Sequence, residues 1–234
     1  MTYAIETDNL TKFYGKSRGI IGITLQVQVG EIFGFLGPNG AGKTTTIRLL
    51  MNLLKPTSGK VSIMGLDADS DSFKARQFCG VVFSEPSFYG KLTGRENLNL
   101  LQGYHSQGNK HSETLADRLE INLDRPVHSY SRGTRQKLAI VQALSHDPKV
   151  LILDEPTSGL DPLVQQEFYM ILKEQKENGV SVFLSSHILS EVDRLCDRVG
   201  IIKDGSLIEL KDVAELRRRS PGESFSLIWL ATIL

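Results

Sequence analysis

The sequence predicts an α/β fold with a mostly parallel β-sheet, an antiparallel β portion and an inserted helical portion. Short, wholly apolar segments such as Val150–Leu153 are typical of buried parallel strands. Segments with helical spacing alternate with them, which is the pattern of a sheet covered by helices. A glycine-rich loop joins one such strand, Ile32–Leu36, to a helix-like segment at Thr44–Leu54, and this connection is typical of the same fold class.

The N-terminal part of the chain predicts the antiparallel portion. Residues Ala4–Val29 alternate short apolar and polar runs, with turn residues at Tyr14-Gly15 and at Ser17–Gly19. After the glycine-rich loop and its helix, Val61–Met64 and Val81–Phe83 have the composition of strands.

The middle of the chain predicts the helical insertion, at approximately residues 88–145. From about Leu98 to Ala143 the pattern is helical, with polar breaks at Gly108-Asn109 and Asp124–Pro126. After Val150–Leu153 the pattern predicts a helix at Leu163–Asn178, a strand at Val180–Leu184 and a helix at Ile188–Arg198. A hairpin around Asp204-Gly205 is predicted to join Val199–Lys203 to Ser206–Leu210.

Length and composition predict one domain, residues 1–234, of ordinary globular type. The chain is 40% hydrophobic and 23% charged. It has 27 Lys and Arg against 27 Asp and Glu, so zero net charge gives no electrostatic reason to expect nucleic acid as the main partner. Cys79 and Cys196 lie far apart, and we expect buried thiols in a reducing cytosol.

Membrane insertion and secretion are not expected from the ends of the chain. Met1–Asn9 lacks the pattern of a signal peptide. The apolar end, Phe225–Leu234, is shorter than the roughly 20 residues that cross a bilayer. We therefore expect no membrane pore from this chain itself.

The glycine-rich loop fits the phosphate-binding pattern G-x-x-x-x-G-K-[ST]. Its glycines let successive backbone N–H groups converge on phosphate oxygens, and the positive end of the following helix favours the same anion. Lys43 adds a positive charge for the β- and γ-phosphates, and the Thr44 hydroxyl is placed to ligate Mg²⁺. The predicted nucleotide-binding residues are Gly37, Pro38, Asn39, Gly40, Ala41, Gly42, Lys43, Thr44 and Thr45.

Two adjacent carboxylates follow the apolar strand Val150–Leu153. An acid at the carboxyl end of a buried strand can hold Mg²⁺ beside the phosphate-binding loop, and Asp154 fits that role. Glu155 points the other way, and it can act as the general base that polarises the attacking water. The pair predicts hydrolysis of the bound nucleotide.

Further motifs follow in a characteristic order. They are Tyr130–Gln136 (YSRGTRQ), Pro156–Asp161 (PTSGLD), and His187 after Ser185-Ser186. Together with the phosphate-binding loop and Asp154-Glu155, they resemble the ATP-binding subunits of ABC transporters over nearly the whole length of the chain. Any one of these motifs is a weak signal, whereas the ordered set is specific to the family.

The resemblance implies roles for five further residues. Tyr14 would stack on adenine, and His187 would contact the γ-phosphate and orient water together with Glu155. Ser131 and Gly133 belong to the signature motif, which in the family closes on the ATP held by a second subunit. Asp161 is the acid of the loop that follows the catalytic strand. Independently, Ser131 precedes the helical run Arg135–Leu144 and is a good N-cap residue.

The resemblance also implies partners and a location. It implies a head-to-tail homodimer or heterodimer that binds two ATP, and a separate membrane-spanning permease. The chain would then be cytoplasmic and peripheral on the inner face of the cell membrane. The segment Tyr89–Leu98, with a capping box from Thr93 to Glu96, resembles the surface that meets the permease. Residues 223–234 resemble the final amphipathic helix of the family.

The sequence departs from the family pattern at two places. Where the family usually has a glutamine that touches Mg²⁺, this chain has Ser84 followed by Glu85, so Ser84, Glu85 or a water is expected to fill that place. Arg132 replaces a frequent glycine of the signature. A basic residue there resembles the drug- and polysaccharide-export branch.

Two other functions fit parts of the pattern. A soluble ATPase of the same type could act on ribosomes or DNA, although the single phosphate-binding loop and the absence of a heptad run argue against it. A regulatory protein that binds nucleotide without hydrolysing it fits Ser84, whereas Glu155 and His187 argue against that function.

Overall fold

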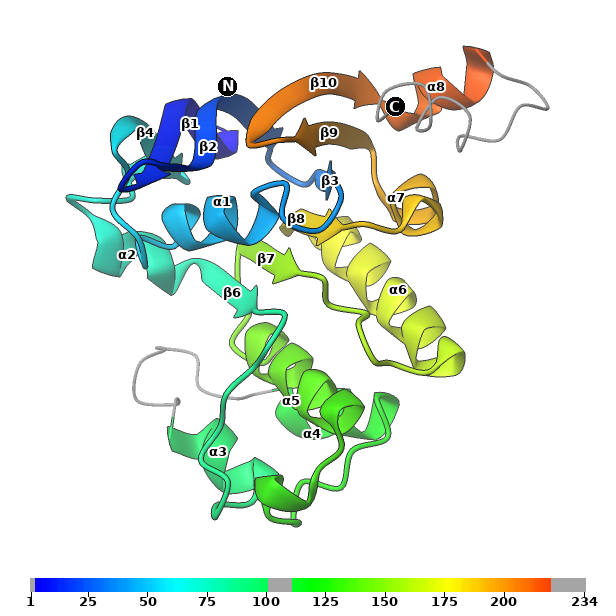
Figure 1. Cartoon of the computed structure of the whole chain (residues 1–234). Helices are drawn as coiled ribbons and strands as arrows, with labels where there is room; N and C mark the ends of the chain where they lie inside the picture. The colour runs from blue at the N-terminus through cyan, green and yellow to red at the C-terminus, as the bar shows by residue number, and fades with distance from the viewer. Residues whose placement is uncertain (1–2, 101–110, 220–234) are drawn as a thin grey trace.

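The computed structural model describes residues 3–100 and 111–219, and its centre is a six-stranded sheet (Figure 1). The strand order is β10-β9-β3-β8-β7-β6. Neighbouring strands are parallel except for β9 and β10, which form an antiparallel hairpin. The strands are β3 (Ile32–Leu36), β6 (Cys79–Val82), β7 (Val150–Asp154), β8 (Ser181–Ser186), β9 (Arg198–Lys203) and β10 (Ser206–Asp212). The predicted α/β class with a mostly parallel sheet is confirmed.

A second, antiparallel sheet has the strand order β2-β1-β4-β5 and lies at the upper left of Figure 1. Its strands are β1 (Tyr3–Tyr14), β2 (Ser17–Gln28), β4 (Ser58–Ile63) and β5 (Leu66–Asp67). The prediction of a turn at Ser17–Gly19 is wrong, because these residues already belong to β2. Gly15, with φ 60°, and Lys16 make the turn, so the second strand begins at Ser17.

Eight α-helices are found among the described residues. They are α1 (Lys43–Leu50), α2 (Ser72–Gln77), α3 (Gly94–Leu100), α4 (Ser112–Arg118), α5 (Arg132–Leu144), α6 (Pro162–Glu177), α7 (Leu189–Leu195) and α8 (Val213–Arg219). Helix α1 ends four residues earlier than predicted, since Asn52 has a positive φ of 52°. Helix α7 ends at Leu195 because Cys196 is extended and the Asp197 N–H donates to Ile32 O.

Helices α3, α4 and α5 form the lower part of the molecule in Figure 1. The predicted capping box begins α3: the Thr93 N–H donates to Glu96 Oε2 (2.7 Å), and the Glu96 N–H donates to Thr93 Oγ1 (3.1 Å). The predicted break at Asp124–Pro126 is also found, in the connection that leads to α5. The other predicted break, Gly108-Asn109, lies outside the described residues, as does the predicted helix 223–234.

The six-stranded sheet separates two apolar clusters. On β3, Ile32 and Leu36 belong to the cluster that contains α5, α6 and α7 side chains, whereas Phe33 and Phe35 belong to the cluster that contains α1 and the antiparallel sheet. The strand β7 alternates in the same way, because successive side chains of a strand point to opposite faces. Both faces of these strands are therefore buried, and their polar residues lie at the strand ends.

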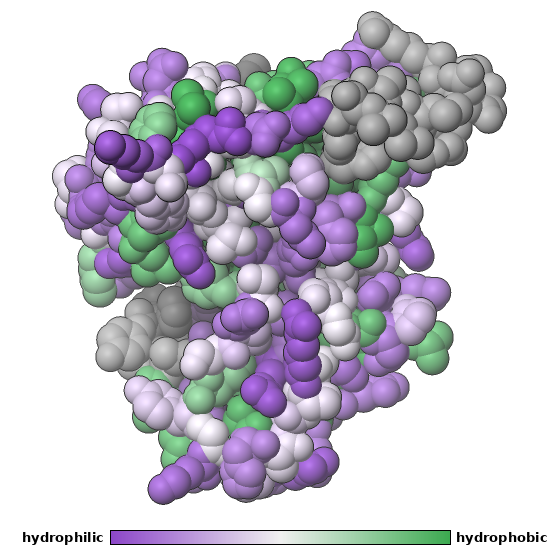
Figure 2. Space-filling model, viewed as in Figure 1, coloured by the Kyte–Doolittle hydropathy of each residue, from purple (hydrophilic) through white to green (hydrophobic). Residues whose placement is uncertain are grey.

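The surface view is consistent with this interior. Figure 2 shows hydrophilic residues spread over the face that is turned to the viewer. Within residues 3–100 and 111–219, no helix is both long and apolar enough to cross a bilayer.

Candidate functional site

The phosphate-binding loop lies between the carboxyl end of β3 and the start of α1. Gly40 and Gly42 have φ values of 80° and 111°, which side chains rarely adopt. A Cβ on Gly42 would also lie 2.6 Å from Ile20 Cγ2. The backbone can therefore take this path only with glycine, and the path directs the first N–H groups of α1 toward the loop.

Lys43 is buried, and its ammonium group has three acceptors. Nζ lies 2.7 Å from Gly37 O, 3.1 Å from Pro38 O and 3.2 Å from Glu155 Oε1. A buried ammonium is stable only when its hydrogens are taken up in this way. The charge is thus held at the mouth of the loop, next to a carboxylate.

Asp154 lies at the end of β7 and is fully buried. Thr44 Oγ1 donates to its Oδ2 (2.8 Å), and Ser185 Oγ donates to its Oδ1 (2.6 Å). A hydroxyl and a carboxylate side by side are hard oxygen donors. Mg²⁺ in nucleotide sites uses one or two such protein ligands and completes its shell with phosphate oxygens and water. The donor set therefore fits Mg²⁺.

Glu155 follows Asp154 and has a φ of 47°, a conformation that is strained for a residue other than glycine. One carboxylate oxygen faces Lys43, and the other lies 3.1 Å from His187 Nδ1. Lys43, Glu155 and His187 follow the carboxyl ends of β3, β7 and β8, and β8 lies between the other two. The strand order therefore brings together three side chains that are far apart in the sequence.

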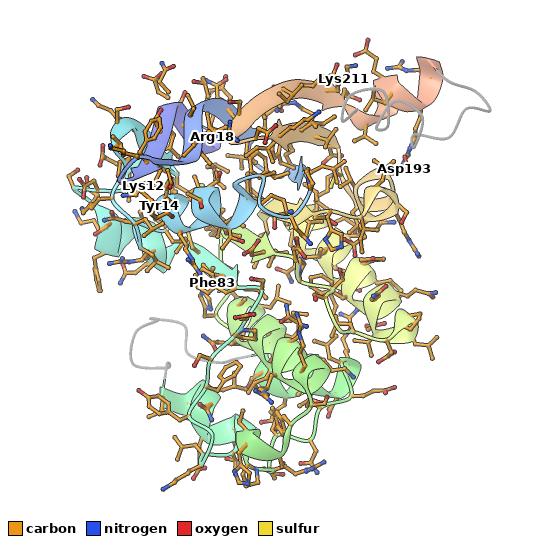
Figure 3. All side chains as sticks on the ribbon, viewed as in Figure 1. Lys12, Tyr14, Arg18, Phe83, Asp193 and Lys211 are labelled. Atoms are coloured by element: carbon orange, nitrogen blue, oxygen red, sulfur yellow. The ribbon has the colours of Figure 1, made fainter. Side chains whose placement is uncertain are left out.

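A pocket of about 220 Å³ opens beside the loop. It is lined by Tyr14, Arg18, Gly19, Asn39, Gly40, Gly42, Lys43, Thr44, Thr45 and Glu155. Tyr14 is about half exposed, and Lys12 Nζ lies 5.7 Å from the centre of its ring. Figure 3 shows Tyr14 and Arg18 on the β1–β2 hairpin, close to α1. The pocket thus combines an aromatic ring with the backbone of the phosphate-binding loop.

Ser131, Gly133 and Asp161 do not line this pocket. Ser131 is the N-cap of α5, where Oγ accepts from the Thr134 N–H (3.1 Å). Asp161 is the N-cap of α6 and accepts from the Val164 N–H (3.0 Å). Arg132 Nη2 donates to Ser158 Oγ (3.2 Å), so the start of α5 packs against the loop that leads from Glu155 to α6.

Ser84 and Glu85 follow the end of β6, next to β7 in the sheet. Ser84 is partly buried and Glu85 is exposed, and neither lines the pocket beside the loop. A metal contact by either residue stays a prediction.

Sequence reasoning missed two polar residues of the site. Ser185 is buried and holds Asp154 in place, and Arg18 lines the pocket. For Ser185, the sequence did contain a signal, namely the pair Ser185-Ser186 at the end of an apolar strand. Arg18 carried no signal, because only the packing of the β1–β2 hairpin brings it to the pocket.

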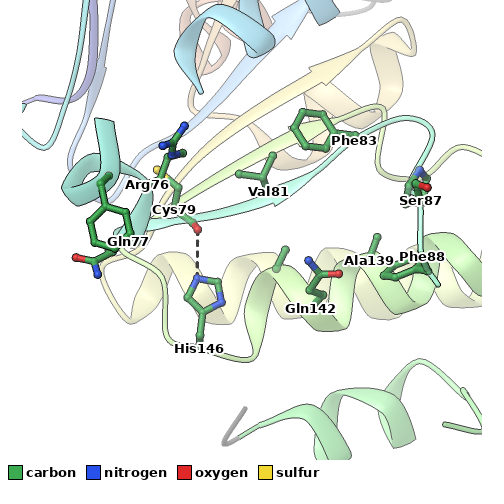
Figure 4. A pocket seen from close by; sticks show the side chains of 13 residues that line it. Arg76, Gln77, Cys79, Val81, Phe83, Ser87, Phe88, Ala139, Gln142 and His146 are labelled. Atoms are coloured by element: carbon green, nitrogen blue, oxygen red, sulfur yellow. Dashed lines mark hydrogen bonds between the residues drawn. The ribbon is translucent and has the colours of Figure 1, made fainter. Parts of the chain in front are cut away.

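A larger, more apolar groove of about 480 Å³ lies between α2, β6 and α5 (Figure 4). Phe73, Val81, Phe83 and Phe88 contribute its apolar surface. At one end, His146 Nε2 lies 3.2 Å from Cys79 O, as the dashed line shows. Burial raises the pKa of the Cys79 thiol to about 12, so this cysteine stays protonated at neutral pH.

Residues 20–158 match the family model described as ABC transporter. The bacitracin transport ATP-binding protein BcrA of Bacillus licheniformis is 40% identical over 94% of this chain and 73% of its own length. The probable multidrug ABC transporter ATP-binding protein YbhF of Escherichia coli is 37% identical over 94% of this chain and 39% of its own length.

Comparison with solved structures indicates the same family. A structure described as the ATP-binding subunit of an ABC transporter superposes with a TM-score of 0.90 at 29% identity, over 98% of this chain and 99% of that one. A dimeric post-hydrolysis state of the cassette MJ0796 bound to ADP and Pi superposes with a TM-score of 0.81 at 25% identity, over 89% and 98%. These findings favour the transporter function over action on ribosomes or DNA. The chain belongs to the ABC transporter family, as one of its ATP-binding subunits.

Proposed function

We propose that the chain hydrolyses Mg²⁺-bound ATP in the pocket beside Lys43 to drive export of a small molecule through a separate permease. The observation that carries the proposal is the position of Glu155, whose two carboxylate oxygens face Lys43 and His187. A general base must reach the attacking water next to the γ-phosphate, and the lysine that binds this phosphate is 3.2 Å away.

The groups that line the pocket have different roles in this proposal. Tyr14 stacks on adenine, while the N–H groups of the loop and Lys43 bind the β- and γ-phosphates. Water attacks the γ-phosphorus, the bond to the β–γ bridging oxygen breaks, and Glu155 accepts the proton of the water. His187 orients that water and contacts the γ-phosphate.

Thr44 and Asp154 would hold Mg²⁺, because their oxygens already lie 2.8 Å apart and Asp154 is fixed by Ser185. When bound, this ion neutralises phosphate charge. Ser84 or Glu85 would complete the site from β6, in the place where the family usually has glutamine.

Two chains act together in this proposal, either two copies or this chain with a related one. Ser131 and Gly133 lie outside the pocket of their own chain, at the start of α5. The N-terminus of a helix suits a phosphate, and in a head-to-tail dimer this one would face the ATP of a second subunit. The dimeric form of the similar cassette MJ0796 supports the same arrangement.

The permease would meet the groove of Figure 4, which lies beside the segment that starts at Tyr89. Its apolar side chains suit a helix with an apolar face. Such a partner would hold the chain at the inner face of the cell membrane. The names of BcrA and YbhF support a drug-like cargo.

The replacement Glu155→Gln tests the catalytic proposal. The amide cannot accept the proton, so we expect the steady-state ATPase rate to fall by roughly 10²- to 10⁴-fold while ATP still binds. Gel filtration with ATP and Mg²⁺ should show a closed dimer that accumulates only in this variant, since hydrolysis is what opens it.

Glu177→Gln is the matched control, because this carboxylate lies at the exposed end of α6. It should keep the rate of the unmodified chain. An unchanged rate in Glu155→Gln would refute the role of Glu155, and a monomer in the presence of ATP would refute the dimer.

A further inference from the structure

A second buried carboxylate, Glu191, lies close to the site on α7. Its side chain is 4% exposed. Three hydroxyl groups donate to it: Thr157 Oγ1 and Tyr169 OH (3.1 Å) donate to Oε1, and Ser186 Oγ donates to Oε2 (2.5 Å). No ion pair to Glu191 is found in the part of the chain that the structure describes, so hydroxyl donors take the place of a cation.

Two of these donors belong to the segments that carry the proposed catalytic side chains. Thr157 follows Glu155 by two residues, and Ser186 directly precedes His187. Each oxygen of the one carboxylate therefore holds a different segment. Ser186 Oγ additionally accepts from the Ile188 N–H (2.9 Å), which fixes the backbone on both sides of His187.

The third donor, Tyr169, anchors the carboxylate to α6. Burial and the neighbouring Glu191 raise the pKa of Tyr169, so the phenol keeps its proton and donates it. The Arg194 guanidinium lies 5.2 Å from the centre of the Tyr169 ring and packs it in place. The arrangement is rigid, because a buried carboxylate is stable only while its hydrogen bonds persist.

We propose that Glu191 is a positioning residue: it sets the distance between Glu155 and His187 by holding their two segments on one carboxylate. The inference rests on the proposed function, since it needs Glu155 and His187 to act together on one water. Geometry at this point matters because small displacements of catalytic groups cost much rate.

The test compares Glu191→Gln and Glu191→Asp with the unmodified chain. Glutamine turns one acceptor into a donor, and aspartate keeps the charge but is one methylene too short to reach both segments. We expect kcat for ATP hydrolysis to fall by roughly 10- to 100-fold. KM for ATP should stay unchanged, because the phosphate-binding loop is separate. The double variant Glu191→Gln with Glu155→Gln should be no slower than Glu155→Gln alone.

Glu31→Gln provides the matched control. Glu31 is also buried, at 5% exposed, and it accepts from the Gln28 N–H (2.6 Å) and from Arg198 Nη1 (3.2 Å). It directly precedes β3 and so lies at the amino end of this strand, whereas the site lies at the carboxyl end. This variant should lower the melting temperature and leave kcat unchanged.

The outcomes separate the inference from the proposed function. If Glu191→Gln lowers only the melting temperature, as Glu31→Gln does, Glu191 is merely structural and the inference is overturned. If Glu155→Gln itself keeps full activity, the proposed function fails instead.

Smaller changes test the inference if Glu191→Gln does not fold. Thr157→Val and Ser186→Ala each remove one donor and leave the carboxylate in place. Each should lower kcat at constant KM, and full kcat in both would overturn the inference.

Discussion

At the scale of single residues, the signature glycine Gly133 is constrained by the loop that starts at Glu155. A Cβ built on Gly133 would lie 2.5 Å from Gly159 O, which is closer than real Cβ contacts come. Gln136 Nε2 donates to Pro156 O (3.1 Å), so the same helix also holds the beginning of this loop. The start of α5 and the loop from Glu155 to α6 are therefore packed together.

Gly133→Ala is expected to slow ATP hydrolysis by about tenfold or more, because the added methyl group would displace Gly159 and, through it, the loop that starts at Glu155. Binding of ATP to the pocket of a single chain, measured by titration without Mg²⁺, should change little, since that pocket does not include Gly133. Gly90→Ala is the control, because the nearest atom to its Cβ would be His128 Cβ at 3.5 Å. Equal ATPase rates for the two variants would contradict this prediction.

At the scale of secondary-structure elements, α6 shows how local signals set the ends of a helix. Asp161 caps its start, and Pro162 occupies the first helical turn. Gly179, with φ 82°, ends it. The hydrogen bond from the Val164 N–H lowers the pKa of Asp161, so the charged form is favoured in the folded state.

Asp161→Ala should lower the melting temperature at neutral pH, because the variant loses the cap acceptor. A lowered folded pKa means that the stabilisation is present above the unfolded value, 3.8, and is lost as the pH falls through the folded value. The difference between the two proteins, measured by circular dichroism, should therefore shrink as the pH falls below 3.8. Asp161→Asn keeps a hydrogen-bond acceptor, so its melting temperature should fall less than that of Asp161→Ala. A difference that is independent of pH would refute the role of the charge.

In the whole molecule, α5 connects the helical part to the sheet, and ion pairs among the described residues add to this connection. Arg118 on α4 contacts Glu167 and Glu174 on α6. The groove of Figure 4 lies where β6 and α2 meet α5, so it borders both parts of the molecule. A partner bound in this groove would contact both parts, so its binding would depend on their relative position.

Phe73→Glu should therefore weaken binding of the proposed membrane partner. Phe73 is 63% exposed in the groove, so a charge there costs little folding free energy but disfavours an apolar contact. The measurement is purification of the tagged chain in mild detergent, followed by mass spectrometry. A multi-spanning membrane protein should accompany the unmodified chain and be depleted with Phe73→Glu.

Met170→Glu is the control, because Met170 is 51% exposed on α6 and does not line the groove. Equal recovery of the membrane protein with both variants would refute the groove as its docking surface. Recovery of no membrane protein with the unmodified chain would refute the permease itself.

Features that depend on neighbours along the chain could be predicted from the sequence. The phosphate-binding loop, the capping box at Thr93 and the hairpin at Asp204-Gly205 were all predicted, because each is set by glycine conformations or by hydrogen bonds over a few residues. The wrong turn at Ser17–Gly19 came from the same local rules, which did not show that Gly15 and Lys16 already complete the turn.

Contacts between distant residues could not be predicted in this way. Ser185 reaches Asp154, Glu155 lies between Lys43 and His187, and Glu191 joins two segments. These contacts follow from the strand order β3-β8-β7, in which strands that are far apart along the chain end side by side. That order depends on how both faces of the sheet are buried, and burial is a property of the packed molecule, so no short stretch of sequence encodes it.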